Sequence, residues 1–581
     1  MLKLSQRKIH FSFVCATSIV ICIIVLQYLS YNDDFIENDD DQSEERLIDY
    51  NNYALMEEEK TRIGAGEHGK PVILENQDEI KENERLYNQT GFYVIASNKI
   101  SVNRSIPDLR STECRAQKYS SVLPKVSIVI IFYNEVFSML KRTLHSIYNR
   151  SPLRLIREIV LVNDASTESE LYNDLKKYVK KNFGKFVKIK NLKERKGLIV
   201  ARMEGARIAK GEILVFLDAH VEVNHNWLPA LITPIKENRK LATVPLIDDF
   251  SSTTFEYFGM VPTRGVFDWM FTFREIKLKN PDTIKSFQVP IMLGCAFAID
   301  RKFFLNDLQG YDEGLQIWNG ENYELSFKLH LCADGILKIP CSRVAHTFRE
   351  INPTRAKSYD YVASNFKRIA EVWLDEYKEI LYSRQPQRFE KAKAGDLTKA
   401  KKVKDSLNCK PFKYFLDVVA KDLVDFYPPL FQIPVFASGA IKSLASEEKF
   451  CLTGVGTIQI PLRLAKCDTN LIEPRDLQHF SLTFFKQIIQ SGTDLCLDAS
   501  NLSIIDCHYD KGNQFWRLEE ETGLLKNNND HGKFCMTADI NEMRVVMEIC
   551  DENNSNQKWT FGYVNATAMR RWNEIYGYKI M

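Results

Sequence analysis

The chain has 581 residues, of which 45% are hydrophobic and 27% are charged, so its length and composition allow several ordinary globular domains. Its formal net charge is +2, and no long basic block stands out. This balance argues against a nucleic-acid-binding protein, whose affinity depends on neutralising phosphates.

An apolar segment near the N-terminus predicts a membrane anchor. Residues 11–29 contain no charged side chain and are long enough to cross a bilayer as a helix. Basic residues precede the segment and acidic residues follow it, which favours a cytoplasmic tail at 1–10 and a lumenal body. The alternative is a cleaved signal peptide, which we disfavour because the apolar run is long and no A-x-A-like cleavage site follows. Residues 30–60 are acidic and polar, as expected of a stalk.

Cysteines and glycosylation motifs support a lumenal position. Two of the 13 cysteines lie in the apolar segment, and the others are Cys114, Cys295, Cys332, Cys341, Cys409, Cys451, Cys467, Cys496, Cys507, Cys535 and Cys550. None of these forms a C-x-x-C pair, so we expect disulfides rather than a zinc site, with at least one thiol left over because their number is odd. N-glycosylation motifs begin at Asn88, Asn103, Asn501, Asn553 and Asn565.

The middle of the chain has the pattern of an α/β domain. Apolar runs typical of buried strands cover Val126–Phe132, Glu158–Val162 and Ile213–Leu217. Helical stretches around Phe137–Tyr148 and Leu171–Asn182 separate these runs, and the alternation predicts a largely parallel sheet. Sheets of this kind bind ligands at the carboxyl ends of their strands, where this chain has polar residues.

The C-terminal part of the chain has a different sequence pattern. Three segments each carry a pair of cysteines, and two of them are followed by a Gln-x-Trp sequence, Gln514-Phe515-Trp516 and Gln557-Lys558-Trp559. A spacing of about forty residues indicates an internal repeat. We expect a small, three-lobed, all-β domain.

A glycine-rich segment, Gly64–Gly69, matches the G-x-G-x-x-G pattern, and with Lys70 it nearly matches a P-loop. No strand is expected before it, and Pro71 stands where a P-loop has Ser or Thr. We interpret it as a glycine-rich turn rather than a nucleotide site.

The sequence Asp218-Ala219-His220 directly follows the apolar strand that ends at Leu217. A carboxylate and an imidazole two residues apart at a strand end point to the same side and can bind a metal ion. Oxygen and imidazole ligands together suit Mn²⁺ better than Mg²⁺. His346 is the candidate third ligand, and Arg349 follows it where a guanidinium could contact a phosphate. The alternative is an exposed turn with a structural histidine elsewhere.

A second constellation is Trp318-Asn319-Gly320-Glu321-Asn322. An indole can stack on the apolar face of a sugar while the carboxylate and amide bond its hydroxyls. The alternative is a loop with a packed tryptophan.

Together these features resemble the polypeptide N-acetylgalactosaminyltransferases over nearly the whole chain. The resemblance is carried by the Asp218–His220 and Trp318–Asn322 motifs and by Phe132–Glu135, Arg142–Ser146, Lys70–Val72 and Ala370–Tyr377. It implies a transmembrane signal-anchor at 11–29, a lumenal stem at 30–120, a GT-A Rossmann-like nucleotide-sugar domain at 121–440 and a ricin-type β-trefoil lectin domain at 445–570. It also implies a Golgi membrane protein of single-pass type II topology.

The resemblance assigns roles to individual residues. It implies that Mn²⁺ is bound by Asp218, His220 and His346. The donor UDP-GalNAc is held by Asp164, Arg195, Ala219, Trp318 and Arg349, with Phe267–Trp269 in the donor-sugar region, and the catalytic positions are Glu321 and Asn322. The implied disulfides are Cys114–Cys341, Cys332–Cys409 and one pair within each lectin repeat, which leaves Cys295 unpaired.

The reaction implied by the resemblance is transfer of GalNAc from UDP-GalNAc to Ser or Thr of proteins or glycopeptides, with retention of the α configuration. No enzyme nucleophile is evident for a covalent intermediate. A same-face attack, with the leaving phosphate helping to take the hydroxyl proton, is therefore our preferred hypothesis.

This chain departs from the family pattern near the active site. The family closes over its donor with a Tyr followed by a Phe-Pro-Gly-Gly loop, but residues 352–359 have Thr354 at the tyrosine position and no glycine. Asn163 replaces the first acid of an Asp-Asp pair, and Asn319 replaces a glycine.

Among the lectin repeats, only the middle one retains the residues that hold sugar hydroxyls in the family, Asp498 and Asn513. We expect these two to bind a GalNAc already present on the substrate. The first and third repeats have Thr453 and Thr537 in place of the acid.

Three functions are therefore compared. The intact Asp218, His220 and His346 favour an active transferase that initiates mucin-type O-glycans, whereas the altered loop at 352–359 favours a lectin-like protein that binds glycopeptides or partners active relatives. A third possibility is transfer restricted to peptides that already carry a glycan.

Overall fold

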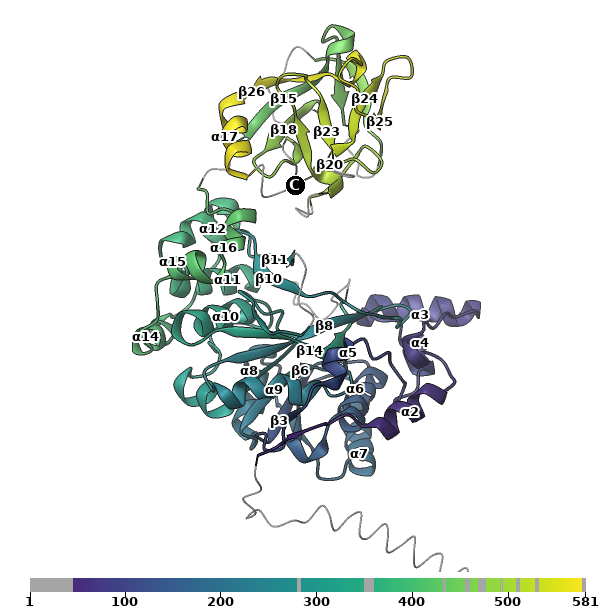
Figure 1. Ribbon diagram of the computed structural model, residues 1–581, viewed down its shortest axis with the longest axis vertical. Coiled ribbons are helices and arrows are strands. Elements are labelled where there is room, and N and C mark those ends of the chain that lie inside the picture. The colour runs from purple at the N-terminus through teal and green to yellow at the C-terminus, as the bar shows by residue number, and fades with distance from the viewer. Residues whose placement is uncertain are drawn as a thin grey trace, which may run out of the picture.

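The structure, a computed structural model, describes residues 45–278, 284–349, 360–431, 435–454, 460–468, 477–491, 493, 495–507, 512–527 and 532–576. Figure 1 shows an α/β domain followed along the chain by a smaller all-β domain. The predicted anchor at 11–29 and the loop at 352–359 lie outside the described residues. Within the part that is described, no helix has both the length and the apolar character needed to span a bilayer.

The α/β domain is built on one mixed sheet with the strand order β12-β14-β8-β13-β6-β3-β4-β5. The half that contains the predicted strands is parallel and consists of β6 (Ile213–Asp218), β3 (Val126–Phe132), β4 (Ile156–Asn163) and β5 (Val187–Asn191). The other half is mixed, because β13 (Ala296–Asp300) runs antiparallel to β6 and β8, whereas β14 (Ile336–His346) runs parallel to β8 (Ala242–Phe250). Short antiparallel strands complete it: β7 (Val221–Val223), β9 (Tyr257–Phe258) and β12 (Phe287–Gln288).

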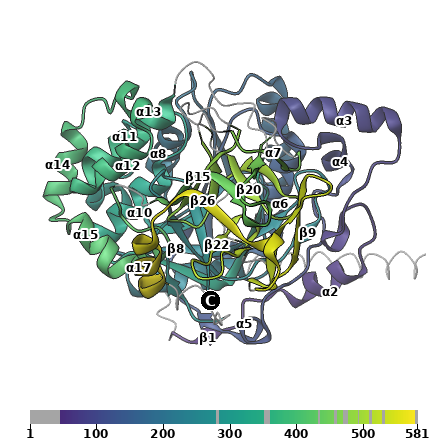
Figure 2. The same ribbon diagram turned by 90° about the horizontal axis from the view of Figure 1, so that it is seen from above.

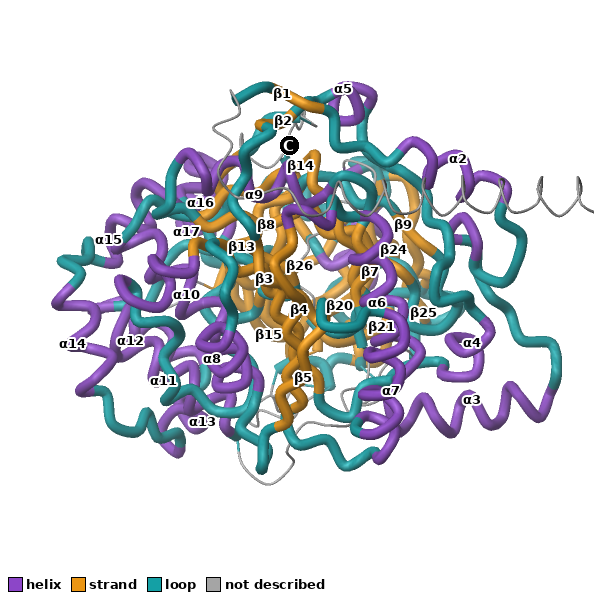
Figure 3. The backbone as a smooth tube through the Cα atoms, turned by 90° about the horizontal axis from the view of Figure 1, so that it is seen from below, coloured by secondary structure: helices purple, strands orange, loops and turns teal. Residues whose placement is uncertain are grey.

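Helices cover both faces of this sheet (Figure 3). On one face, β3 contributes Ile128 and Ile130 to a buried cluster with α6 (Phe137–Arg150), α7 (Asn173–Asn182) and α9 (Trp227–Glu237). On the other face, Val129 joins a second cluster with α8 (Leu198–Ile208). Successive strand residues point to opposite faces, so the uninterrupted apolar run of β3 fits a strand buried on both sides.

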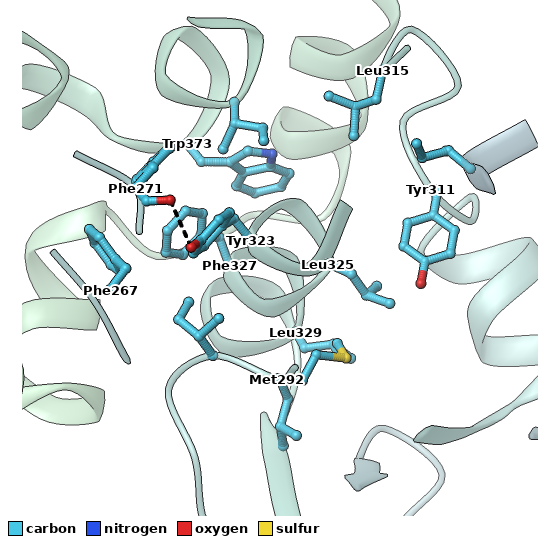
Figure 4. Close-up of a cluster of buried hydrophobic side chains, with 14 of the residues drawn as sticks. Phe267, Phe271, Met292, Tyr311, Leu315, Tyr323, Leu325, Phe327, Leu329 and Trp373 are labelled. Carbon is cyan, nitrogen blue, oxygen red and sulfur yellow. Dashed lines mark hydrogen bonds between the residues drawn. The ribbon is translucent and has the colours of Figure 1, made fainter. Parts of the chain in front are cut away.

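The second cluster continues into an aromatic core behind α10 (Glu321–Cys332). Figure 4 shows Tyr323 of α10 beside Phe271, whose carbonyl oxygen accepts a hydrogen bond from the Tyr323 hydroxyl at 2.9 Å. Phe271 lies in the turn of the hairpin β10 (Thr263–Phe267) and β11 (Phe273–Lys277). The surrounding helices are α11 (Tyr361–Trp373), α12 (Lys378–Arg384), α13 (Pro386–Lys391), α14 (Thr398–Ser406), α15 (Phe412–Tyr414) and α16 (Lys421–Phe426).

The described part of the predicted stem packs on the α/β domain instead of standing apart from it. It forms β1 (Leu47–Ile48), α2 (Tyr53–Thr61), α3 (Gln77–Thr90), α4 (Val94–Lys99), α5 (Thr112–Ala116) and β2 (Tyr119–Ser120). The helices α2, α3 and α4 lie at the right of Figure 2. Two buried ion pairs hold this segment in place: Glu59 with Arg150 at 2.9 Å, and Arg104 with Glu222 at 2.9 Å.

The glycine-rich segment at 64–69 follows a helix, α2, and forms a tight turn, in agreement with its interpretation from the sequence. A Cβ at Gly69, whose φ is +71°, would lie 2.6 Å from the Cβ of Tyr257. The glycine is therefore required for backbone conformation and close packing.

The C-terminal domain contains antiparallel strands and ends in α17 (Ala566–Tyr576). Its strands are β15 (Val435–Ser443), β16 (Phe450–Thr453), β17 (Arg463–Lys466), β18 (His479–Thr483), β19 (Ile488–Gln490), β20 (Leu495–Asp498), β21 (Ser503–Asp506), β22 (Trp516–Leu518), β23 (Leu525–Asn527), β24 (Phe534–Asp539), β25 (Arg544–Ile549) and β26 (Trp559–Val564).

The two Gln-x-Trp sequences occupy equivalent places in this domain. Trp516 donates a hydrogen bond to the carbonyl of Leu497 at 2.9 Å, and Trp559 donates to that of Met536 at 2.7 Å. Each accepting residue follows the first cysteine of its repeat, so the repeat predicted from the sequence is present in the structure.

The structure contains the disulfides Cys114–Cys341, Cys332–Cys409, Cys451–Cys467, Cys496–Cys507 and Cys535–Cys550, the same pairs that the family resemblance implies. Cys295 is buried and unpaired. The first disulfide connects the N-terminal segment to β14, which reinforces its attachment to the α/β domain.

Candidate active site

The Asp218-Ala219-His220 turn connects β6 to β7 and is held from behind by α6. The hydroxyl of Thr143 bonds the carbonyl oxygens of Ala219 and Val221 at 2.9 and 2.8 Å. The short strand β7 then pairs antiparallel with β14, which places His346 directly opposite Val221. Strand pairing thus brings together side chains that are far apart in the sequence.

Asp218, His220 and His346 form a cluster that fits a metal ion. One ligand atom from each lies within 4.8 Å of the other two, and Nε2 of His346 lies 3.3 Å from Oδ2 of Asp218. The Nδ1 of His220 lies 2.8 Å from Oε2 of Glu135. A carboxylate can only accept, so this Nδ1 carries the hydrogen and Nε2 keeps its lone pair for a ligand. One carboxylate and two imidazoles form a donor set suited to Mn²⁺.

The protonation states of two ligands also fit a metal site. Burial raises the pKa of Asp218, but the hydrogen bond with His346 and the charge of Arg202 outweigh it and leave the pKa below its ordinary value. Burial lowers the pKa of His346, which favours the neutral imidazole that metal ions require.

Glu135, which follows β3, connects this cluster to a cation. Its two carboxylate oxygens accept hydrogen bonds from Arg349 at 2.9 and 2.8 Å. Burial raises the pKa of Glu135, but the charge of Arg349 and the hydrogen bond from His220 outweigh it and lower the pKa to about 2. Phe92, from the N-terminal segment, lies against both Arg349 and His220. Its ring centroid is 4.5 Å from Cζ of Arg349 and 5.5 Å from the centroid of the His220 ring. The predicted stem therefore contributes a side chain beside the site.

Asp164 lies at the carboxyl end of β4 and organises the loop that carries Arg195. Its carboxylate accepts hydrogen bonds from the backbone N–H groups of Lys196 and Gly197 at 2.7 and 2.8 Å. The guanidinium of Arg195 stacks on Tyr133 with Cζ 3.9 Å from the ring centroid. A planar cation and an aromatic ring are thus fixed next to a carboxylate, an arrangement suited to a nucleotide.

Gly197 allows this loop to meet the one that carries Trp318. Its φ is +89°, and a Cβ there would lie 2.4 Å from the backbone Cα of Ile317. The N–H of Leu198 donates to the carbonyl of Ile317 at 2.7 Å. Trp318, next to Ile317, keeps 42% of its surface exposed, so its indole is accessible to a ligand.

Glu321 and Asn322 begin α10, deeper than Trp318. Glu321 is buried, which raises its pKa, and its Oε1 lies 3.8 Å from Arg202, which also bonds Oδ1 of Asp218 at 3.2 Å. The other oxygen of Glu321 is buried and has no hydrogen-bond partner among the residues that the structure describes. Preceding Gly320, Asn319 has a φ of +74°. Asparagine is among the non-glycine residues that adopt this conformation most readily, which explains how it replaces the family's glycine.

A cavity of about 420 Å³ unites most of the predicted residues. It is lined by Asp164, Arg195, Asp218, Ala219, His220, Trp318, His346 and Arg349. Glu321 and Asn322 do not line it. Phe267 and Trp269 lie in the buried core, where Trp269 donates to the carbonyl of Tyr427 at 2.8 Å, so the donor-sugar placement of Phe267–Trp269 finds no support in the packing.

Sequence reasoning assigned no role to Glu135, Arg202 or Thr143, which support the site through buried contacts. It noted the polar strand end containing Glu135, and that signal could have identified this residue. Asn163, at the end of β4, donates to Asn191 at 3.1 Å and accepts from the N–H of Ser166 at 2.9 Å. An ionised aspartate could not make the first of these bonds.

The middle lectin repeat brings Asp498 and Asn513 together, because the amide of Asn513 donates to the Asp498 carboxylate. In the first repeat, Thr453 instead accepts a hydrogen bond from Gln478 at 3.0 Å. In the third repeat, Thr537 is buried, and its hydroxyl donates a hydrogen bond to the backbone carbonyl of Cys535, two residues earlier. The sugar-binding pair predicted from the sequence is therefore assembled in the middle repeat.

The mixed sheet of the α/β domain carries a metal-binding cluster at its strand ends, beside a nucleotide-sized cavity, and a three-lobed β domain follows it along the chain. These features define a glycosyltransferase with a lectin module. In agreement, residues 127–306 match the family described as "Glycosyl transferase family 2", and residues 437–562 match the "Ricin-type beta-trefoil lectin domain".

The chain belongs to the polypeptide N-acetylgalactosaminyltransferase family. It is 38% identical over 549 residues to polypeptide N-acetylgalactosaminyltransferase 10 of Mus musculus. The matched region covers 92% of this chain and 89% of the relative. It is 39% identical over 538 residues to N-acetylgalactosaminyltransferase 4 of Drosophila melanogaster, covering 90% of this chain and 83% of the relative. The crystal structure of GalNAc-T7 with UDP, GalNAc and Mn²⁺ is 32% identical with a TM-score of 0.63, covering 87% of this chain and 93% of that one.

Proposed function

We propose that the chain transfers N-acetylgalactosamine from UDP-GalNAc to serine and threonine hydroxyls of proteins, with retention of the α configuration. The observation that carries the proposal is that the Asp218, His220 and His346 cluster lines the same cavity as Asp164 and Arg195. The family to which the chain belongs and the UDP, GalNAc and Mn²⁺ held by GalNAc-T7 support the choice of donor.

Asp218, His220 and His346 would hold a manganese ion, which would supply Lewis-acid stabilisation to the departing diphosphate. Arg349 stands beside them as a further cation. Its Nε is buried and makes no hydrogen bond among the described residues, so it is a donor for a diphosphate oxygen.

The nucleoside end of the donor would lie at Asp164 and Arg195. The Asp164 carboxylate fixes the backbone of the loop, and the stacked Tyr133 fixes the guanidinium of Arg195. Both groups are thereby oriented before the ligand arrives, which reduces the ordering cost of binding.

We assign the donor sugar to the side of the cavity formed by Ala219 and Trp318. The exposed indole of Trp318 offers a face for the sugar ring. One oxygen of Glu321, at the start of α10, makes no hydrogen bond among the described residues and would accept one from a sugar hydroxyl once this first turn of the helix shifts toward the cavity. Among the described residues, the carboxylates that line the cavity are Asp164, Asp218 and Glu135, and each of these is engaged in the contacts described above. We therefore retain the same-face mechanism, in which the leaving phosphate helps to take the acceptor hydroxyl proton.

Two further proposals concern the acceptor and the location. Asp498 and Asn513 would bind a GalNAc already attached to the substrate and so favour glycopeptide acceptors. We place the protein in the Golgi membrane, with a tail at 1–10, an anchor at 11–29, a stem segment within 30–120, and catalytic and lectin domains at 121–440 and 445–570. The disulfides support this location, since such bonds persist in oxidising compartments.

The test is transfer of labelled GalNAc from UDP-GalNAc to a panel of Ser/Thr peptides and GalNAc-peptides by the full-length chain in detergent. We expect an α-linked product that requires Mn²⁺ and is abolished by chelation and by Asp218→Ala. If a folded chain transfers to no acceptor but still binds GalNAc-peptides through Asp498, the lectin-like function replaces this proposal.

A further inference from the structure

The hairpin that ends at the middle lectin site also carries a glycosylation motif. Asp498 is the last residue of β20, and Asn501-Leu502-Ser503 begins three residues later, leading into β21. The strand β20 is labelled in Figure 1, in the all-β domain. Ser500, between the two, lies 3.3 Å from the amide of Asn513. The glycosylation motif therefore lies directly beside Asp498 and Asn513.

Asn501 is presented in an accessible and well-supported conformation. Its side chain is exposed, and its Oδ1 accepts a hydrogen bond from the hydroxyl of Ser503 at 2.6 Å. Its amide nitrogen makes no hydrogen bond to the part of the chain that the structure describes. The base of the hairpin is anchored, because Leu502 is buried and its carbonyl accepts from the N–H of Leu462 at 2.7 Å. An exposed tip on an anchored base suits a modified asparagine.

The other motifs are engaged differently. The hydroxyl of Thr90 donates to the carbonyl of Leu86 at 2.9 Å, and that of Ser105 donates to Glu67 at 2.7 Å. Asn565 caps α17, because its Oδ1 accepts from the N–H of Ala568 at 3.1 Å. Asn553 is exposed in the third repeat, which lacks the sugar-binding acid, and so provides a matched control.

We propose that Asn501 carries an N-linked glycan that stands beside the middle lectin site and restricts which glycopeptides reach it. In the step that attaches it, Nδ2 of Asn501 bonds to the anomeric carbon of a lipid-diphosphate-linked oligosaccharide. The bond from that carbon to the diphosphate oxygen breaks, the lipid diphosphate leaves with the electron pair, and Nδ2 releases one proton. This inference rests on the lumenal location given under the proposed function.

The steric consequence follows from the short separation. Three residues span at most about 11 Å, so the first sugars on Asn501 lie within reach of a ligand held by Asp498 and Asn513. A peptide with one GalNAc can still place it on these residues, whereas a peptide with neighbouring glycans must clear the attached chain. The glycan therefore makes the site selective for sparsely glycosylated acceptors.

The experiment uses the full-length chain expressed in animal cells, with glycopeptide mapping of every motif. Binding to a peptide with three adjacent GalNAc residues is then compared for the wild type, Asn501→Gln, Asn553→Gln and Asp498→Ala. We expect Asn501 to be occupied, and Asn501→Gln to bind the crowded peptide at least threefold more tightly. Asn553→Gln should match the wild type, and Asp498→Ala should lose binding.

Three results would overturn the inference, and they differ in their meaning. Occupancy at another motif with Asn501 unmodified refutes the site but leaves the lumenal location intact. Occupancy at no motif refutes this inference and removes the support that glycosylation would give to the lumenal location. An occupied Asn501 whose replacement leaves the affinity for the crowded peptide unchanged refutes the steric role.

Discussion

Replacing Glu135 by glutamine should weaken Mn²⁺ binding without disrupting the fold. Glu135 is only 5% exposed, and its carboxylate bonds both His220 and Arg349. Glutamine preserves the size of the side chain and one acceptor oxygen. It removes the negative charge that fixes the hydrogen of His220 on Nδ1 and balances Arg349.

The size of the effect follows from these two contacts. Loss of a group that orients a metal-binding histidine typically lowers metal affinity by about 10–100-fold, which corresponds to about 1.4–2.7 kcal/mol. The unpaired guanidinium of Arg349 also lowers the free energy of unfolding, by up to about 3 kcal/mol, because a largely buried charge loses its partner. We therefore expect a higher dissociation constant for Mn²⁺ together with a lower melting temperature.

The assay is calorimetric titration of Mn²⁺ into the wild type and Glu135→Gln, with thermal unfolding measured in parallel. The matched control is Glu158→Gln, since Glu158 is also buried and accepts from Ser127 and the N–H of Lys210, but lies near the start of β4, away from the site. The control should lower stability and leave Mn²⁺ affinity unchanged. Equal Mn²⁺ affinity, within twofold, for the wild type and Glu135→Gln would refute the role given to this carboxylate.

Three further substitutions test other parts of the site. Phe92→Leu removes the ring that contacts Arg349. A partly desolvated cation–π contact contributes about 1 kcal/mol, so kcat/KM for UDP-GalNAc should fall about fivefold. An unchanged kcat/KM would show that the N-terminal segment does not shape the site. Gly197→Ala places a Cβ 2.4 Å from the backbone of Ile317 and should raise the dissociation constant for UDP at least tenfold. Titration with UDP measures this constant, and an unchanged affinity would contradict the prediction. Asp498→Ala should abolish the preference for GalNAc-peptides while leaving transfer to unglycosylated peptides intact, and loss of both activities would count against a purely lectin role.

The strands and repeats could be predicted because their signals are local. The apolar run of β3 spans one strand buried on both faces, and each Gln-x-Trp sequence marks one repeat. The pairing of β7 with β14, which places His346 opposite Val221, depends on residues more than a hundred positions apart and was not predicted from the sequence.

The N-terminal segment shows where composition misleads. Its charged residues suggest a solvated stalk, but Glu59 and Arg104 are buried in ion pairs with the α/β domain, and Phe92 is completely buried beside Arg349. A charged side chain has the same appearance in a sequence whether its partner is water or a distant residue. For the same reason Arg202, whose contacts lie 16 residues and more away, carried no recognisable signal.

The most direct test of the metal-dependent donor site is calorimetric titration of UDP into the full-length chain with Mn²⁺ and with a chelator, for the wild type and His346→Gln. If Asp218, His220 and His346 form one site with Asp164 and Arg195, UDP should bind the wild type tightly only when Mn²⁺ is present, and the metal should no longer enhance binding in the variant. Equal UDP affinity in Mn²⁺ and in chelator for the wild type would contradict the assignment of this cluster to a metal that holds the donor.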